Sequence, residues 1–117
     1  RLYLLWDGGV RTGRISMNRF VEITSTAPAK IFGLYPRKGT IAVGADADVL
    51  VWDGEKRHEL SEKTLHMRVD YSPYEGREVV GAPTHVLSRG KVIVENGTYV
   101  GKKGHGRFVK RGTFNLM

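Results

Sequence analysis

Apolar residues change their spacing along the chain from a helical to a strand pattern near residue 40. Met17, Phe20, Val21 and Thr24 recur at intervals of three and four residues, which is the pattern of a helix with one apolar face. Ser16 precedes this stripe, and its hydroxyl can accept a hydrogen bond from a free N–H group of the first turn. The pattern therefore predicts a helix that begins after Ser16.

Two shorter helical segments are expected on either side of this helix. Leu2–Trp6 is followed by an aspartate and two glycines, which predicts the end of a helix with a glycine stop. Thr26 is expected to cap a second short helix that runs through Phe32 and ends at Gly33. Pro28 fits there, because N–H groups in a first turn have no helical partner.

Beyond residue 40 the pattern predicts strands. Val49–Trp52 is a short continuous apolar run, typical of a strand that is buried on both faces. Residues 59–64 are ambiguous, and we expect a loop with a possible strand at 64–69. Residues 71–76 are expected to form a loop.

Three closely spaced strands follow and predict a β-meander. They are expected at residues 84–88, 91–95 and 98–100. Asn96 and Gly97 separate the last two strands and are the favoured pair for a type I′ hairpin turn. Residues 101–106 contain three glycines and no apolar residue, and we expect a flexible linker into the C-terminal tail.

This order of helices first and strands afterwards indicates an α+β fragment that draws on two layers or domains of a larger protein. Two capped helices alone would leave their apolar faces uncovered. The chain also opens directly into an apolar stretch, Leu2–Trp6, without an initiator Met. We therefore expect a segment that is cut from a longer polypeptide.

The net charge of +7 is concentrated in the tail, because residues 101–117 hold five cations and no acid. Such a tail can bind nucleic acid or an acidic partner. A solvated terminus, or an arm that packs on a neighbouring subunit, is the more ordinary interpretation. The chain has no cysteine, which excludes disulfides and thiolate metal sites. No apolar run approaches the ~20 residues that a membrane span needs.

Composition and spacing reveal no active site. The histidines at positions 58, 66, 85 and 105 are separated by 8, 19 and 20 residues, and none forms the short spacings that place two imidazoles on one metal ion. Asp46 and Asp48 could bind Mg²⁺ or act as acid and base. Their position after a glycine turn favours a structural role in bonding backbone N–H groups.

The sequence resembles the C-terminal portion of dihydropyrimidinases and D-hydantoinases, the cyclic amidase family of the amidohydrolase superfamily. The piece Gly44-Ala45-Asp46-Ala47-Asp48 before an apolar strand is typical of the superfamily. The resemblance to the narrower family covers essentially the whole chain and is carried mainly by residues 18–34, 35–49, 71–76, 88–91 and 104–111.

This resemblance implies a fold and a division of the chain. The family fold is a distorted (β/α)8 barrel that is accompanied by a β-sandwich built from both chain ends. Residues 1–40 would be the last helices of the barrel, residues 41–100 the C-terminal part of the sandwich, and residues 101–117 a basic C-terminal tail.

The resemblance also implies the chemistry of the parent protein. The family hydrolyses the ring amide of dihydropyrimidines or hydantoins to N-carbamoyl amino acids. It uses two zinc ions bridged by a carboxylated lysine, which activate a hydroxide and polarise the carbonyl. The metal ligands would all precede Arg1, so we expect no catalytic, cofactor-binding or metal-binding residue in this chain, and no activity of the chain alone.

The partners that the resemblance implies are the remainder of the same polypeptide and further subunits of a homotetramer. Arg107, Phe108 and Lys110 in the tail are our candidates for contacts between subunits. We expect no nucleic acid and no membrane as partners, and a cytoplasmic location, which agrees with the absence of cysteine.

Two other functions stay open at this point. A dihydropyrimidinase-related protein without enzymatic activity would share this segment but lack the zinc ligands. A free-standing basic module would bind RNA or an acidic protein through residues 102–111, with a steep dependence on salt.

Overall fold

The first helix extends past the glycines at which it was expected to end. The computed structural model describes residues 1–114, and α1 (Leu2–Leu5) runs directly into a π-helical turn, η1 (Trp6–Val10). Gly9 is buried within this turn, and a Cβ there would lie 3.0 Å from the Ile15 side chain. The predicted stop is therefore wrong, because Gly9 serves close packing.

A second helical stretch covers residues 17–31 without a break. It consists of α2 (Met17–Val21), the π-helical turn η2 (Glu22–Thr26) and α3 (Ala27–Ile31). Ser16 caps it as predicted, since its side-chain oxygen accepts a hydrogen bond of 3.1 Å from the Arg19 N–H.

The predicted cap at Thr26 is wrong, because the Thr26 backbone is itself helical. The Thr26 hydroxyl donates instead to the Gly39 carbonyl at 2.8 Å. The wide turn of η2 lets the helix continue through Pro28, which has no N–H group to give to an ordinary α-helical bond. The end at Gly33 is confirmed, with a φ of +66° that favours glycine.

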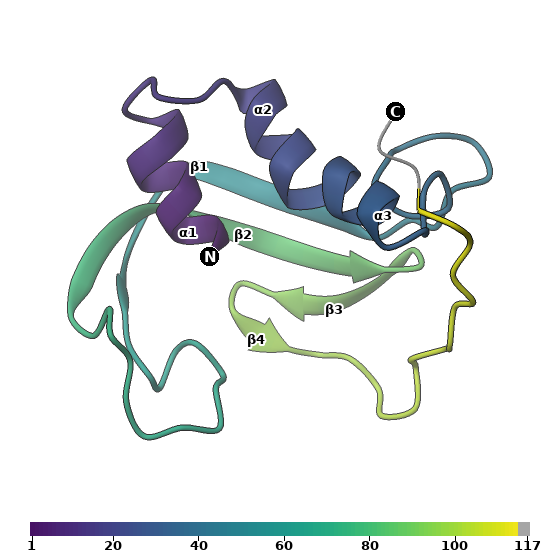
Figure 1. Cartoon of the computed structure of the whole chain (residues 1–117). Helices are drawn as coiled ribbons and strands as arrows, with labels where there is room; N and C mark the ends of the chain where they lie inside the picture. The colour runs from purple at the N-terminus through teal and green to yellow at the C-terminus, as the bar shows by residue number, and fades with distance from the viewer. Residues whose placement is uncertain (115–117) are drawn as a thin grey trace.

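A four-stranded antiparallel sheet follows in chain order, as Figure 1 shows. Its strands are β1 (Val49–Leu60), β2 (Arg77–Ser88), β3 (Lys91–Glu95) and β4 (Thr98–Tyr99). The predicted meander is confirmed. Its last turn has positive φ at both Asn96 and Gly97, as a type I′ turn requires.

The long first half of β2 was not predicted, because a glycine and a proline at positions 81 and 83 interrupt the strand pattern. The possible strand at residues 64–69 is wrong, since this stretch forms turns and bends, whereas the loop at 71–76 is confirmed. β1 is also not buried on both faces. Val51 is 48% exposed, and residues from Trp52 to Glu59 alternate between half-buried and exposed because the helices cover only one face of the sheet.

Aromatic rings hold the helices on the sheet. The Trp6 ring from η1 lies 5.6 Å from the ring of Phe20 in α2 and 5.6 Å from the ring of Trp52 in β1. Tyr3 from α1 lies 6.1 Å from Trp52 on the other side. Aromatic pairs at such distances add to the stabilisation from apolar burial. The core is therefore an interface between helix and sheet.

A β-bulge forms the seat of Trp6. The pairing of β1 with β2 slips between Asp53 and Arg57, beside Gly81 of β2. A Cβ on Gly54 would lie 2.7 Å from the Trp6 ring, and one on Gly81 would overlap the ring. The Trp6 Nε1–H group donates to the Gly54 carbonyl at 3.2 Å. The indole thus fills a notch that exists because both strands carry glycine there.

The next residue fastens the same turn to the other strand. The Asp7 carboxylate accepts a hydrogen bond of 3.2 Å from the Val80 N–H and forms an ion pair of 2.9 Å with Arg11. The coarse prediction of an α+β fragment is confirmed. No helix within residues 1–114 is long and apolar enough to cross a membrane.

We predict that Gly81→Ala lowers the free energy of unfolding by about 2 to 4 kcal/mol, because the methyl group must displace the Trp6 ring and the backbone is strained. Gly76→Ala is the matched control, since Gly76 also has a positive φ of +75° but has open space around it. Its cost is expected to be about 1 to 2 kcal/mol of backbone strain. Urea unfolding of the two variants measures the difference, and equal losses would contradict the notch.

Candidate functional site

The strongest candidates for chemistry, Asp46 and Asp48, are both engaged by basic and backbone groups. Asp46 forms ion pairs of 3.0 Å with Arg37 and 2.9 Å with Lys38. Asp48 pairs with Lys38 and accepts a hydrogen bond of 2.8 Å from the Arg89 N–H at the β2–β3 turn. Asp48 therefore ties the segment after α3 to the far end of the sheet and accepts from a backbone N–H group, as predicted. Asp46 differs from the prediction, because its carboxylate pairs with basic side chains instead.

The pKa values of these groups reflect the network. Hydrogen bonds from Lys38 and Arg37 lower the pKa of Asp46. Desolvation raises the pKa of Asp48, but the hydrogen bonds from Lys38 and the Arg89 backbone outweigh it and the pKa is lowered. Desolvation lowers the pKa of Lys38, and the two aspartates more than reverse this, so that it is raised. All three groups are charged at neutral pH.

The four histidines lie in four different places, each with its own neighbour. His66 Nε2 lies 3.3 Å from the Gly97 carbonyl oxygen, and His85 Nδ1 lies 3.2 Å from the Thr84 hydroxyl oxygen. His105 Nε2 lies 3.0 Å from the Ser88 carbonyl oxygen. Within residues 1–114, no group of three or more His, Cys, Asp or Glu is placed to hold a metal ion. The described residues therefore do not fit a zinc centre.

His58 has both of its ring nitrogens buried. Its ring meets the Tyr3 ring edge-on, with 4.7 Å between the centroids. Burial lowers the pKa of His58, and the Lys56 backbone opposes this only in part. Burial likewise raises the pKa of Tyr3. Both effects favour neutral rings that pack the end of α1 on β1.

The basic tail is fastened to the rest of the chain at two points, which corrects the expectation of a flexible linker. The Arg89 guanidinium donates to the His105 carbonyl, and the His105 ring meets the Ser88 carbonyl. Further on, the Gly112 N–H donates to the Gly33 carbonyl at 2.8 Å. A side chain on Gly33 would overlap the Gly112 backbone, so glycine is needed where the tail crosses the end of α3.

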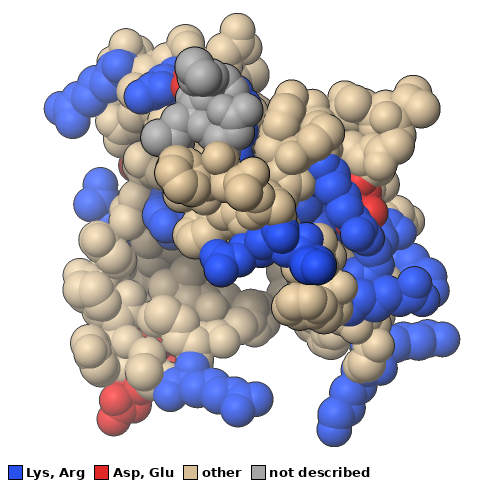
Figure 2. Space-filling model, turned by 45° about the vertical axis from the view of Figure 1, so that its right-hand side comes forward, with Lys and Arg blue, Asp and Glu red and all other residues tan. Residues whose placement is uncertain are grey.

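The three tail residues that we expected at a subunit contact lie between these two anchors. Arg107, Phe108 and Lys110 are all exposed, and Phe108 is 92% exposed. Figure 2 shows the side of the molecule on which the tail runs, where Lys and Arg side chains gather and acidic ones show only in small patches. Residues 115–117 of the predicted tail lie outside the described residues.

Comparison with known proteins identifies the family. The model of the amidohydrolase family matches residues 1–93 of this chain. The chain belongs to the amidohydrolase family. This agrees with the piece around Asp46 and Asp48, which in the structure contact Lys38 and the β2–β3 turn.

The similar proteins include D-hydantoinases and a dihydropyrimidinase. This amidohydrolase chain is 49% identical to the D-hydantoinase of Geobacillus stearothermophilus over 117 residues, which are 100% of this chain and 25% of the relative. A solved D-hydantoinase from Bacillus sp. AR9 matches with a TM-score of 0.93 and 53% identity, over 98% of this chain and 25% of that one.

A dihydropyrimidinase from Brevibacillus agri NCHU1002 matches equally well, with a TM-score of 0.93 and 52% identity over 98% of this chain and 25% of that one. The resemblance to hydantoinases and dihydropyrimidinases is thereby confirmed. The amidohydrolase chain spans about a quarter of the length of these relatives.

Sequence reasoning missed the residues that organise this structure. Trp6, Gly54 and Gly81 come from three separate segments, and no local pattern links a tryptophan to distant glycines. The single available signal was the glycine and proline within an otherwise β-rich stretch at positions 81 and 83, which is typical of a bulge.

We predict that Asp48→Asn makes the free energy of unfolding depend less steeply on pH in acid. The folded pKa of Asp48 is below its unfolded value, so its contribution is present above about pH 4 and is lost as the pH falls through the folded pKa. The free energy of unfolding, measured by urea titration between about pH 3 and 6, should therefore fall less steeply in the variant.

The control for this prediction is Asp70→Asn, since Asp70 is an exposed residue in the loop before β2. That variant should keep the slope of the unmodified chain. If Asp48→Asn left the slope unchanged, the Asp48 network would contribute nothing measurable to the folded state.

Proposed function

We propose that this chain is the C-terminal portion of a zinc-dependent cyclic amidase, a hydrolase that opens the ring amide of dihydropyrimidines or hydantoins to N-carbamoyl amino acids. The observation that carries the proposal is the identity of 49% along the full 117 residues to a D-hydantoinase. A solved D-hydantoinase of 53% identity supports it with a TM-score of 0.93.

In this proposal the chain is scaffold. Residues 1–40 supply the last helices of the (β/α)8 barrel, residues 41–100 the C-terminal strands of the β-sandwich, and residues 101–117 the closing tail. The two zinc ions and the carboxylated lysine that bridges them belong to the part of the polypeptide that has no counterpart here. When bound, such ions supply an activated hydroxide and polarise the amide carbonyl.

The contribution of the described residues is to hold the segments of this scaffold together. Trp6 and Asp7 seat the first helix on the sheet, and Asp48 fixes the β2–β3 turn. Such support acts on a reaction only through the position of other parts of the protein. The chain by itself is therefore expected to be inactive.

The test is the chemistry of the full-length protein. We expect the protein to open the ring of hydantoin or dihydrouracil, which is measured as a fall in ultraviolet absorbance. Elemental analysis should find two zinc ions per subunit. Removal of the metal with a chelator should abolish the activity, and zinc should restore it. Neither activity nor bound zinc is expected for the isolated chain.

The same measurement separates the alternatives. A full-length protein with neither zinc nor ring opening would be a dihydropyrimidinase-related protein without enzymatic function. Retention on heparin that depends steeply on salt and is removed by deletion of residues 101–117 would instead indicate a basic binding module.

We further propose a cytoplasmic homotetramer in which the tail contacts a neighbouring subunit. Phe108 is almost fully exposed, it follows Arg107 and lies two residues before Lys110, and His105 and Gly112 hold the segment on the chain. An exposed aromatic side chain among basic residues on a fixed segment is the composition of an interface anchor.

We predict that Phe108→Ser combined with Arg107→Ser and Lys110→Ser shifts the full-length protein toward smaller assemblies, measured by light scattering after size-exclusion chromatography. Lys102→Ser with Lys103→Ser removes as many charges from the same tail and is the control. If both variants lost the tetramer, the positive charge of the tail as a whole would be responsible, and not the three named residues. If neither variant lost the tetramer, the proposed tail contact would be excluded.

A further inference from the structure

The apolar face of the helix of residues 17–31 is only partly covered. Phe20 is buried against the rest of the chain. Met17 and Val21, which lie on the same face at helical spacing, are 60% and 52% exposed. The apolar stripe of a helix in a globular protein normally faces the core. Part of this stripe therefore lacks a packing partner among the described residues.

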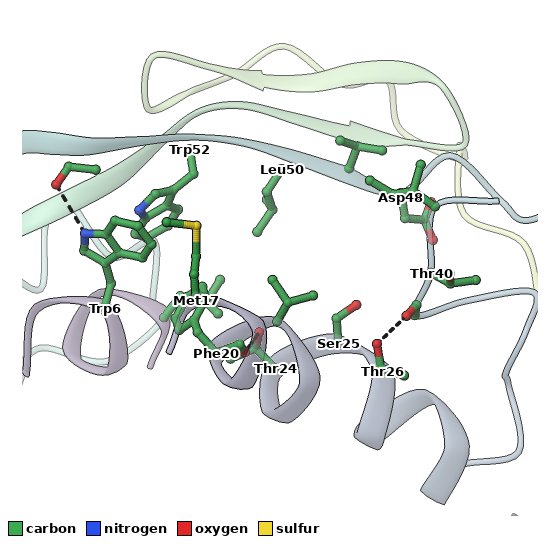
Figure 3. A pocket seen from close by; sticks show the side chains of 16 residues that line it. Trp6, Met17, Phe20, Thr24, Ser25, Thr26, Thr40, Asp48, Leu50 and Trp52 are labelled. Atoms are coloured by element: carbon green, nitrogen blue, oxygen red, sulfur yellow. Dashed lines mark hydrogen bonds between the residues drawn. The ribbon is translucent and has the colours of Figure 1, made fainter. Parts of the chain in front are cut away.

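A groove of about 670 Å³ runs between this helix and β1 (Figure 3). Met17 and Val21 line it from the helix, and Leu50 points into it from the strand. Figure 3 shows that Leu50 and Trp52 project toward the helix while open space separates Leu50 from it. The exposed Ile41 continues the apolar lining beyond the end of the helix.

Two of the polar side chains in the groove are already engaged. Thr26 donates its hydroxyl to the Gly39 carbonyl, and the Asp48 carboxylate is held by Lys38 and the Arg89 N–H. The buried Trp52 Nε1–H group has no hydrogen-bond partner among the described residues and could donate to one backbone carbonyl of an occupant. The remaining lining is mainly apolar, and a charged occupant would lose its hydration there without a matching charge, which is costly. The chemistry of the groove therefore favours an apolar segment.

We propose that the groove is the seat of an apolar segment of the same polypeptide, from the three quarters of the relatives' length that this chain does not span. This inference rests on the proposed function, because it requires the longer protein. An obligate contact of this kind resembles a core cut in half. The described surface has that character, since the exposed side chains of Met17, Val21, Leu50 and Ile41 border one concavity.

A second copy of the chain fits this surface less well. A symmetric contact between two copies places the same patch against itself, and this requires a patch that is self-complementary. Two concave grooves that face each other would enclose a void instead. An inserted segment of the same chain fills the concavity and needs no symmetry.

Two native methionines give a direct test in the unmodified full-length protein. In this chain Met17 is 60% exposed and lies in the groove, whereas Met67 is 42% exposed and lies in the loop between β1 and β2. Oxidation of methionine by hydrogen peroxide follows the exposure of the thioether. An empty groove predicts that Met17 oxidises at least as fast as Met67. A filled groove inverts the order.

We expect Met17 to oxidise at least tenfold more slowly than Met67 in the native full-length protein, as measured by peptide mass spectrometry over time. Urea should remove the difference. Oxidation of Met17 at a rate equal to or above that of Met67 under native conditions would overturn the proposal.

A cysteine pair supplies the second measurement, because this chain has no cysteine of its own. Val21→Cys probes the groove and Val69→Cys is the control, since the two valines are 52% and 48% exposed here. Maleimide should label position 69 at least tenfold faster in the folded full-length protein. Equal labelling would count against the proposal.

The same measurements distinguish the occupant. Protection of Met17 that disappears on dilution to folded monomers would mean that a second copy fills the groove, and it would overturn our choice. Zinc content and ring opening of the same sample test the proposed function separately. Protection in an inactive protein would leave the groove proposal standing while the enzymatic one fails.

Discussion

The structure depends on the fit of one indole ring into a break in the sheet. Trp6 lies where β1 and β2 lose register, against glycines on both strands, and its N–H group satisfies the Gly54 carbonyl. A regular pair of strands with side chains at these positions would leave no space for the ring. Phe20 and Trp52 pack around the indole, so that both helical stretches reach the sheet through the same contact. Close packing of this kind tolerates little change in volume.

Ion pairs and backbone hydrogen bonds close the other end of the molecule. Asp46 and Asp48 connect the segment after α3 with the β2–β3 turn through Lys38 and the Arg89 N–H. The Arg89 guanidinium then reaches the tail at His105, and the tail returns to Gly33 at the end of the helix. The segment around Asp46 and Asp48 thus connects separate parts of this chain. Two nearby carboxylates are the residue types of a cation site, but here their charge is matched by Arg37 and Lys38.

The described surface of the amidohydrolase chain leaves an apolar area uncovered, as expected if the chain is part of a longer protein. The apolar face of helix 17–31 is buried at Phe20 but exposed at Met17 and Val21, and the groove beside it faces solvent. The free energy gained from hydrophobic burial is proportional to the apolar area removed from water. This surface therefore contributes to stability only when another segment covers it. Relatives four times as long, at about 50% identity, agree with that picture. In the proposed function, this chain supports the position of other parts of the protein that carry out the chemistry.

Local chemistry in the sequence was enough to determine the cap at Ser16, the helix end at Gly33, the meander and its Asn96–Gly97 turn. Each of these depends on a few neighbouring residues and on the backbone angles that they favour. The sequence also favoured a structural role for Asp46 and Asp48. It could not reveal that the first helix passes through its glycines, that Thr26 lies inside a helix, or that β2 begins at residue 77. Those outcomes depend on Ile15 meeting Gly9, on the wide turn before Pro28, and on Trp6 meeting Gly81. These features were decided by contacts between residues distant in the sequence. A glycine in the sequence shows that a side chain is absent, but it does not show which distant residue occupies the space.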